Sequence, residues 1–184
     1  MEEQIAHELI ELAQHDLAVR ERLLTENKLS GGYNSEMEAV HKANAAQLRE
    51  IISLIGWPTR SKVGAEASDA AWLIVQHSIG EASFMRASYQ LMLNSMDDIN
   101  PQNVAYLYDR ICYFEGRPQR YGTQYGDRQM YPVEDKAVVN ILREELKLPL
   151  IASTDIIEDT NAEKSGDLHT DAGFNAWRRE AGWI

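Results

Sequence analysis

Apolar residues recur at helical spacing from the N-terminus onward, which favours a largely helical chain. Side chains three or four positions apart line one face of a helix. The segment from Glu2 to Glu26 follows this spacing, with charged residues between the apolar ones. A second segment, from Glu36 to Ile55, follows Ser35, a predicted N-cap with Glu38 three residues later. The sequence therefore predicts two long amphipathic helices.

Further helical segments follow along the chain. The spacing predicts a very apolar helix from Ala67 that ends or kinks at Gly80, and an amphipathic helix from Glu81 to Ser95. Pro101 suits the first turn of another helix. The last predicted elements are a short strand or extended arm at Gln129 to Val133, a helix from Asp135 to Leu146, and an amphipathic segment from Phe174 to Trp183.

These elements predict a mainly α fold, a single-domain bundle of about six helices with a polar loop and a short β arm. The chain has 184 residues, enough for one domain with a sizeable core. We place the helical domain at residues 1–150. Residues 151–184 form an acidic linker and a C-terminal amphipathic segment, because Ser153 to Asp171 is polar and has few apolar residues.

Composition excludes several classes of function. The formal net charge is -11, so we expect no nucleic-acid partner, because such partners require clustered Lys and Arg. The same charge disfavours an anionic membrane surface. Cys112 is the only cysteine, so the chain forms no internal disulfide. With no secretory signal and no long apolar stretch in the sequence, we expect a cytoplasmic protein.

Polar residues interrupt three of the apolar stripes. Asp16 follows Ile5, Leu9 and Leu12 on the first helix, Asn44 lies in the stripe of the second, and His77 falls in that of the third. Buried polar groups are expected to be hydrogen-bonded. The three side chains therefore form either a structural network that fixes helix register or the floor of a pocket.

Histidines on three successive helices raise the question of a metal site. His15 and His41 each neighbour a stripe residue and lie about 100° from the stripe centre. The five histidines contain no His-x-x-x-His pair. We therefore predict no metal and no cofactor, and if a metal is bound, His77 and Asp16 are the expected ligands.

A polar loop, Gly116 to Gln124, follows the helix that begins at Pro101. It is rich in hydrogen-bonding side chains and glycine, and loops of this kind often carry function. Gln119, Tyr121 and Gln124 belong to it, and Arg110 precedes it on the helix. These residues either line a binding site or cap helix ends and cover the bundle.

Four sequence motifs occur together in order: Gly56 to Ser61, Ala70 to His77, Leu107 to Arg110, and the polar loop. Their order and spacing, over roughly residues 8–150, resemble the DUF6624 family of bacterial proteins. Asp16, four residues before Arg20, and Asn44 match further family positions. The resemblance implies a mostly helical domain and supplies no reaction. It leaves Ile151 to Ile184 outside, and it departs at Ser78-Ile79, where members have Ala-Asp.

The leading hypothesis is a small-molecule enzyme that performs hydrolysis or group transfer on a polar metabolite bearing a carboxylate or phosphate. His77 is the general acid/base and Asp16 orients it or balances its charge. The predicted substrate-binding residues are Asn44, Gln76, Arg110, Gln119, Tyr121 and Gln124.

The alternative is a non-catalytic binding or interaction protein whose buried polar groups are structural. In that reading residues 174–183 contact a protein partner or a second copy of the chain.

Overall fold

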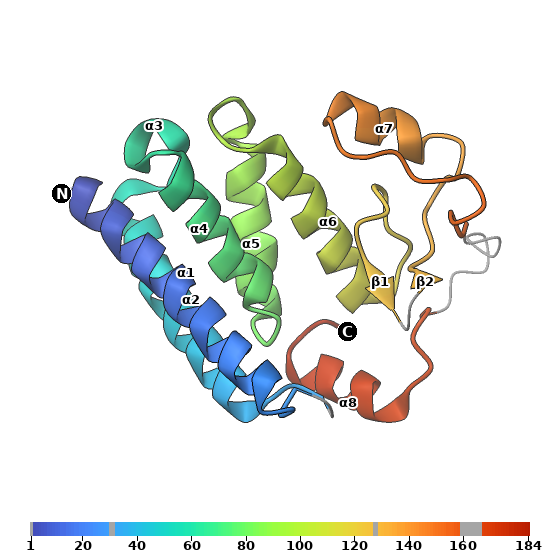
Figure 1. The fold of residues 1–184 in the computed structure, drawn as a ribbon, viewed down its shortest axis with the longest axis horizontal. Helices are drawn as coiled ribbons and strands as arrows, with labels where there is room; N and C mark the ends of the chain where they lie inside the picture. The colour runs from blue at the N-terminus through green and yellow to red at the C-terminus, as the bar shows by residue number, and fades with distance from the viewer. Residues whose placement is uncertain (1, 30–31, 127–128, 159–166) are drawn as a thin grey trace. The chain divides into compact units, whose positions relative to one another are not determined.

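The structure is a computed structural model that describes residues 2–29, 32–126, 129–158 and 167–184. It confirms a mainly helical fold, with eight α-helices and one two-stranded sheet in those residues (Figure 1). By contacts within the chain, it divides into two compact units, Met1–Asn100 and Pro101–Ile184. The sequence-based division at residue 150 stays a prediction, and each unit is described by itself.

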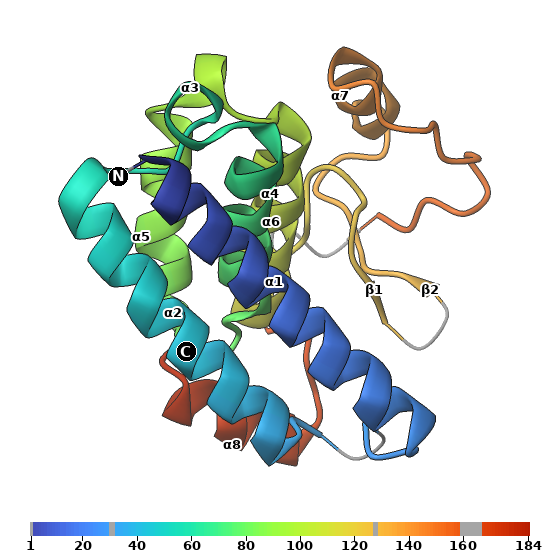
Figure 2. The ribbon, with the colours of Figure 1, turned by 60° about the vertical axis from the view of Figure 1, so that its left-hand side comes forward.

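The described residues of unit 1 form helices and no strand. Both views show α1 and α2 running side by side (Figures 1 and 2), and α4 contacts both of them. The core of the unit contains Leu9, Leu48 and Ile74, whose side chains are almost completely buried. Its elements are α1 (Glu2–Thr25), α2 (Ser35–Ile55), α3 (Arg60–Val63), α4 (Ala65–His77), α5 (Ala82–Leu93) and the 3₁₀ helix η1 (Met96–Asp98).

Two helix ends in unit 1 differ from the sequence prediction. Asn34, rather than Ser35, is the N-cap of α2, since its Oδ1 accepts hydrogen bonds from the backbone N–H groups of Glu36 and Met37 at 2.9 and 3.2 Å. Both residue types suit this position, so the choice is set by backbone geometry. The predicted third helix ends at His77 instead of Gly80.

Unit 2 combines helices with a short hairpin. Its elements are α6 (Pro101–Glu115), β1 (Tyr125–Gly126), β2 (Gln129–Met130), α7 (Val139–Glu145) and α8 (Ala172–Glu180). The strands are antiparallel and pair Tyr125 with Met130, and Val133 forms bridges to Gln119 and Glu158. The predicted arm at Gln129 to Val133 is thus a short strand followed by a bridged residue.

The helix predicted to begin at Asp135 begins at Val139 instead. The Asp135 carboxylate accepts a hydrogen bond from the backbone N–H of Ala137 at 2.8 Å, which closes a turn before the helix. Aspartate favours such turns because its side chain bonds the backbone two residues later.

The C-terminal segment packs within unit 2. The Phe114 ring on α6 stacks on Trp183 with centroids 5.1 Å apart and meets Trp177 edge-on. Arg178 is fully buried, and its Nε donates to the carbonyl oxygen of Phe114 at 2.6 Å. Residues 159–166 of the predicted linker lie outside the described residues. No helix in the described ranges is long and apolar enough to cross a bilayer.

Candidate functional site

Asp16 is the centre of the candidate site in unit 1. It lies on α1 in register with the buried residues Ile5, Leu9 and Ala13. The helical period therefore carries a carboxylate into the core, where only 1% of it is exposed. A buried carboxylate is costly unless it is paired and hydrogen-bonded.

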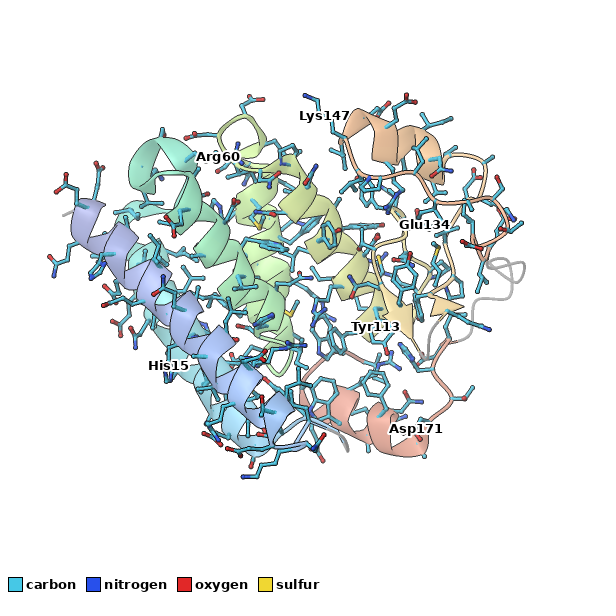
Figure 3. The ribbon with its side chains drawn as sticks, in the orientation of Figure 1. His15, Arg60, Tyr113, Glu134, Lys147 and Asp171 are labelled. Carbon is cyan, nitrogen blue, oxygen red and sulfur yellow. The ribbon has the colours of Figure 1, made fainter. Side chains whose placement is uncertain are left out.

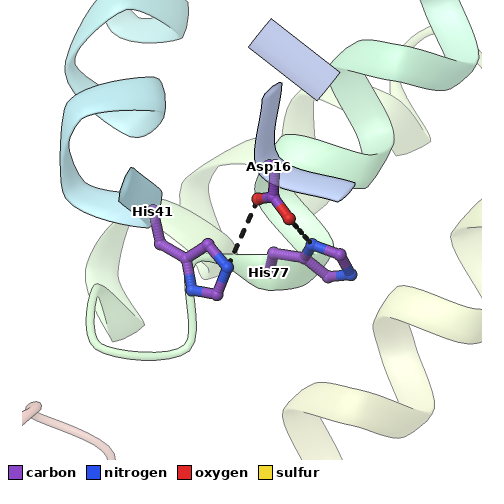
Figure 4. Close-up of side chains that lie close together, drawn as sticks. All are labelled: Asp16, His41 and His77. Carbon is purple, nitrogen blue, oxygen red and sulfur yellow. Dashed lines mark hydrogen bonds and ion pairs between the residues drawn. The ribbon is translucent and has the colours of Figure 1, made fainter. Parts of the chain in front are cut away.

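Two histidines from other helices face this carboxylate (Figure 4). His77, the last residue of α4, donates from Nδ1 to Asp16 Oδ1 at 2.9 Å. His41, on α2, places its Nε2 3.3 Å from Asp16 Oδ2. The two imidazole rings are 5.4 Å apart between centroids. Asp16, His41 and His77 together form what we call the Asp–His cluster.

The two histidines determine the direction in which the pKa of Asp16 shifts. Burial by itself raises the pKa of this carboxyl, because it penalises the charged form. The interactions with His41 and His77 act in the opposite direction and outweigh burial, so the pKa of Asp16 lies well below its usual value. Asp16 is therefore a carboxylate at neutral pH and attracts positive charge to this position.

His41 is the residue that sequence reasoning missed. The prediction that it lies off its stripe is wrong: only 8% of it is exposed, and it follows the buried Met37 by four residues on α2. The prediction took Val40 as the stripe residue, but Val40 is only partly buried. The spacing Met37, His41, Ala45, Leu48 was the signal that could have found it. His15, by contrast, is exposed on α1 (Figure 3).

Two buried atoms of the cluster lack a hydrogen bond. Asp16 Oδ2 and His41 Nε2 form none with any described residue, since their 3.3 Å approach has unsuitable angles. His41 Nδ1 shares a 2.7 Å hydrogen bond with the hydroxyl of Tyr33. Tyr33 therefore holds His41 from outside the cluster, whereas Asp16 Oδ2 and His41 Nε2 at its centre lack a hydrogen bond of good geometry.

The cluster contains the donor types of a metal site. One ligand atom from each of Asp16, His41 and His77 can be chosen so that all three lie within 4.8 Å of one another. Imidazole nitrogen and carboxylate oxygen are common ligands of zinc and other transition metals.

The other predicted residues of unit 1 have different surroundings. Asn44 is buried, and its Nδ2 donates to the backbone oxygen of Leu12 at 3.2 Å, which links α2 to α1. Gln76 is also buried, and its Oε1 forms no hydrogen bond with the described residues. Asn44 therefore forms a hydrogen bond that connects two helices, whereas Gln76 Oε1 has no hydrogen-bond donor among the described residues.

The remaining predicted site residues lie in unit 2, where the polar loop is organised around Asp109. This carboxylate is fully buried and accepts hydrogen bonds from the backbone N–H groups of Arg120, Tyr121 and Thr123, at 2.8 to 3.1 Å. The hydroxyl of Thr123 donates a further bond at 3.0 Å. Asp109 therefore fixes the loop to α6.

Two glutamines complete the polar loop. The fully buried Gln119 donates from Nε2 to the carbonyl oxygens of Gln124 and Tyr131, and its Oε1 accepts from the N–H of Gln124. Arg110 donates to Gln124 Oε1 at 3.3 Å. These contacts are internal to unit 2, and the binding roles of Arg110, Gln119, Tyr121 and Gln124 stay predictions.

Fold and site together define a mainly helical protein with a buried carboxylate between two histidines. The chain belongs to DUF6624, a family of unknown function, whose profile matches residues 3–165 of 184. The match extends beyond the predicted 8–150 into the C-terminal segment. No curated protein and no solved structure matches the chain.

Proposed function

We propose that this protein is a small-molecule enzyme whose reaction centre is the Asp–His cluster, and that it performs hydrolysis or group transfer on a polar metabolite. The observation that carries the proposal is the 2.9 Å bond from His77 Nδ1 to Asp16. His77 remains solvent-accessible, with 19% of its side chain exposed, while Asp16 is enclosed.

Such a pair can move protons. A carboxylate that accepts from one ring nitrogen fixes the tautomer and orientation of the imidazole, and the other nitrogen exchanges a proton with substrate or water. The second ring nitrogen of His77 points away from Asp16 (Figure 4). In this proposal His77 is the general acid/base, and Asp16 orients it and balances its charge.

Substrate recognition is a finer part of the proposal. Gln76 is adjacent to His77 and has an acceptor that forms no hydrogen bond with the described residues. The proposed metabolite bears a carboxylate or phosphate. A bacterial, cytoplasmic setting belongs to the same proposal.

The experiment is a screen of polar metabolites for ligands that raise the melting temperature of the full chain, followed by turnover assays on the hits. A ligand at 100 times its dissociation constant adds about 2.7 kcal/mol to stability. His77→Ala should fold and lose turnover, while the exposed control His15→Ala should match wild type. If His77→Ala retains wild-type turnover, the assignment of His77 fails.

A non-catalytic protein with a structural polar network is the second candidate. It is favoured by the way Asp16 links α1 to two other helices and by the bond from Asn44 to Leu12. In this case His77→Ala would lower stability, and no metabolite in the screen would bind. A protein partner at residues 174–183 belongs to this alternative. A pull-down with Trp177→Ala as the comparison variant tests it.

A further inference from the structure

We infer that the Asp–His cluster binds a divalent transition-metal ion through Asp16, His41 and His77. This inference rests on the proposed function only for its catalytic consequence. The site itself is argued from the geometry of unit 1 and is tested by metal binding without any substrate.

The donor set is the first argument. Two imidazole nitrogens and one carboxylate oxygen, contributed by three different helices, converge within 4.8 Å. Protein ligands lie about 2.0–2.2 Å from a zinc ion, so ligands of one ion are about 3–4 Å apart. Small side-chain movements therefore suffice to close the cluster around an ion. Three protein ligands leave a coordination position open, as in catalytic sites.

The unbonded atoms are the second argument. Asp16 Oδ2 and His41 Nε2 are buried and lie 3.3 Å apart as an ion pair, without good hydrogen-bond geometry between them and without a hydrogen bond to any other described residue. Buried polar atoms in native proteins nearly always have a partner, and an ion is one explanation for an exception. A cation near both atoms would satisfy each of them.

Tyr33 supplies the third argument. Histidines that bind metals usually hydrogen-bond through their other ring nitrogen, which fixes the tautomer and the ring orientation. His41 meets this condition, since its Nδ1 shares a 2.7 Å bond with the Tyr33 hydroxyl and its Nε2 faces Asp16. The tyrosine is thus placed to hold His41 in the orientation that an ion requires.

An ion would change which group carries the proton. An ion bound at His77 Nδ1 would take the place of the proton shared with Asp16 Oδ1, and the neutral imidazole would carry its proton on Nε2 instead, so His77 would become a ligand. The acid–base role proposed for His77 would then pass to a water molecule in the open position, because bound transition metals lower the pKa of water. The reaction centre stays the same, and hydrolysis or group transfer remains the proposed reaction class.

Calorimetric titration of the full chain with Zn²⁺ tests the site. The protein is prepared without a polyhistidine tag and treated with a chelator. We expect wild type to bind about one ion per chain. Asp16→Asn, His41→Gln and His77→Gln should each weaken binding by more than the roughly 10–100-fold cost of losing an outer-shell partner, and Tyr33→Phe should fall within that range.

His15→Gln is the matched control, because it removes an exposed histidine next to Asp16 and should bind Zn²⁺ like wild type. Circular dichroism establishes that each variant is folded, and melting curves with and without Zn²⁺ provide a second readout. Wild type that binds no Zn²⁺, or cluster variants that bind it like wild type, would overturn the inference.

The outcomes separate the two proposals. If Zn²⁺ binds at the cluster but no metabolite is turned over, the metal site stands and the enzyme proposal fails. If chelator-treated protein and His41→Gln both retain full turnover, the catalytic consequence of the metal is wrong and the His77–Asp16 pair carries the reaction alone, while the Zn²⁺ titration still decides whether the cluster binds metal.

Discussion

Asp16 in unit 1 and Asp109 in unit 2 are both almost completely buried aspartates on helices, but their partners differ. Asp109 accepts bonds from three backbone N–H groups and a hydroxyl of the polar loop, and both of its oxygens are bonded. Asp16 is paired with two titratable imidazoles, and its Oδ2 lacks a hydrogen bond to any described residue.

The pKa directions follow from these partners. Burial raises the pKa of Asp109 even though hydrogen bonds from the loop act against it. The histidines lower the pKa of Asp16 despite its burial. A buried carboxylate saturated by its own loop is typical of a structural role, whereas one with titratable partners and an unbonded oxygen indicates a functional site.

The largest expected effect separates the two aspartates by stability. Asp109→Asn should lower the free energy of unfolding by about 1–2 kcal/mol, because the asparagine NH2 group cannot accept the bonds of the loop donors, while burial already disfavours the charged form of Asp109. Asp16→Asn in metal-free protein should lower it by about 3–5 kcal/mol, because the lowered pKa of Asp16 shows that the folded state favours its charge and because one partner of a buried pair is removed. Urea unfolding of the full chain measures both, with the exposed Asp97→Asn as control. Equal losses of unfolding free energy in Asp16→Asn and Asp109→Asn would contradict the proposed difference between the two aspartates.

Gln119 tests whether the polar loop is structural. Gln119→Leu should cost about 2–3 kcal/mol, because it leaves backbone groups of Gln124 and Tyr131 unbonded in the interior. The comparison variant is the exposed Gln129→Leu. Chemical denaturation gives the stability and the metabolite screen gives binding. If Gln119→Leu keeps full stability but loses ligand binding, Gln119 binds substrate and its role is not structural.

Asn44 sharpens the comparison inside unit 1. Its bond to the Leu12 carbonyl is structural, so Asn44→Ala should lower stability by about 1 kcal/mol and leave Zn²⁺ affinity unchanged. Urea unfolding and calorimetry on the same preparation provide the two values. A large loss of Zn²⁺ affinity in this variant would mean that the functional site is wider than the Asp–His cluster.

His169 gives the smallest effect, a pH dependence in unit 2. Burial lowers the pKa of His169 below its ordinary 6.5, and its Nε2 donates to the Tyr113 carbonyl. Below pH 6.5 the unfolded chain therefore binds more protons than the folded one, so this histidine reduces stability as pH falls towards its folded pKa. Stability should therefore decline between pH 7 and 5, and His169→Gln should flatten that part of the profile. If the stability of His169→Gln falls with pH as steeply as that of wild type, other titratable groups cause the pH dependence.

Sequence periodicity predicted the long helices because each apolar stripe is a local property of the chain. The same stripes identified Asp16 and His77 as buried or partly buried polar residues. His41 was missed because a one-residue error in phase rotates a helical position by about 100°. Asn34 and Ser35 are neighbouring residues that both suit an N-cap, so only backbone geometry distinguishes them.

The role of Asp109 could not be predicted from periodicity. Its partners are backbone groups 11 to 14 residues later, and such bonds depend on the path of the loop. The division into two units is also a property of contacts that no local pattern encodes.

The most direct test of metal binding by the Asp–His cluster is anomalous X-ray diffraction at the zinc edge, on crystals of the full chain grown with Zn²⁺. We expect a peak about 2.0–2.2 Å from Asp16, His41 and His77. Crystals of a Zn²⁺-bound chain that show no peak there, with Asp16 bonded to both histidines, would contradict this expectation.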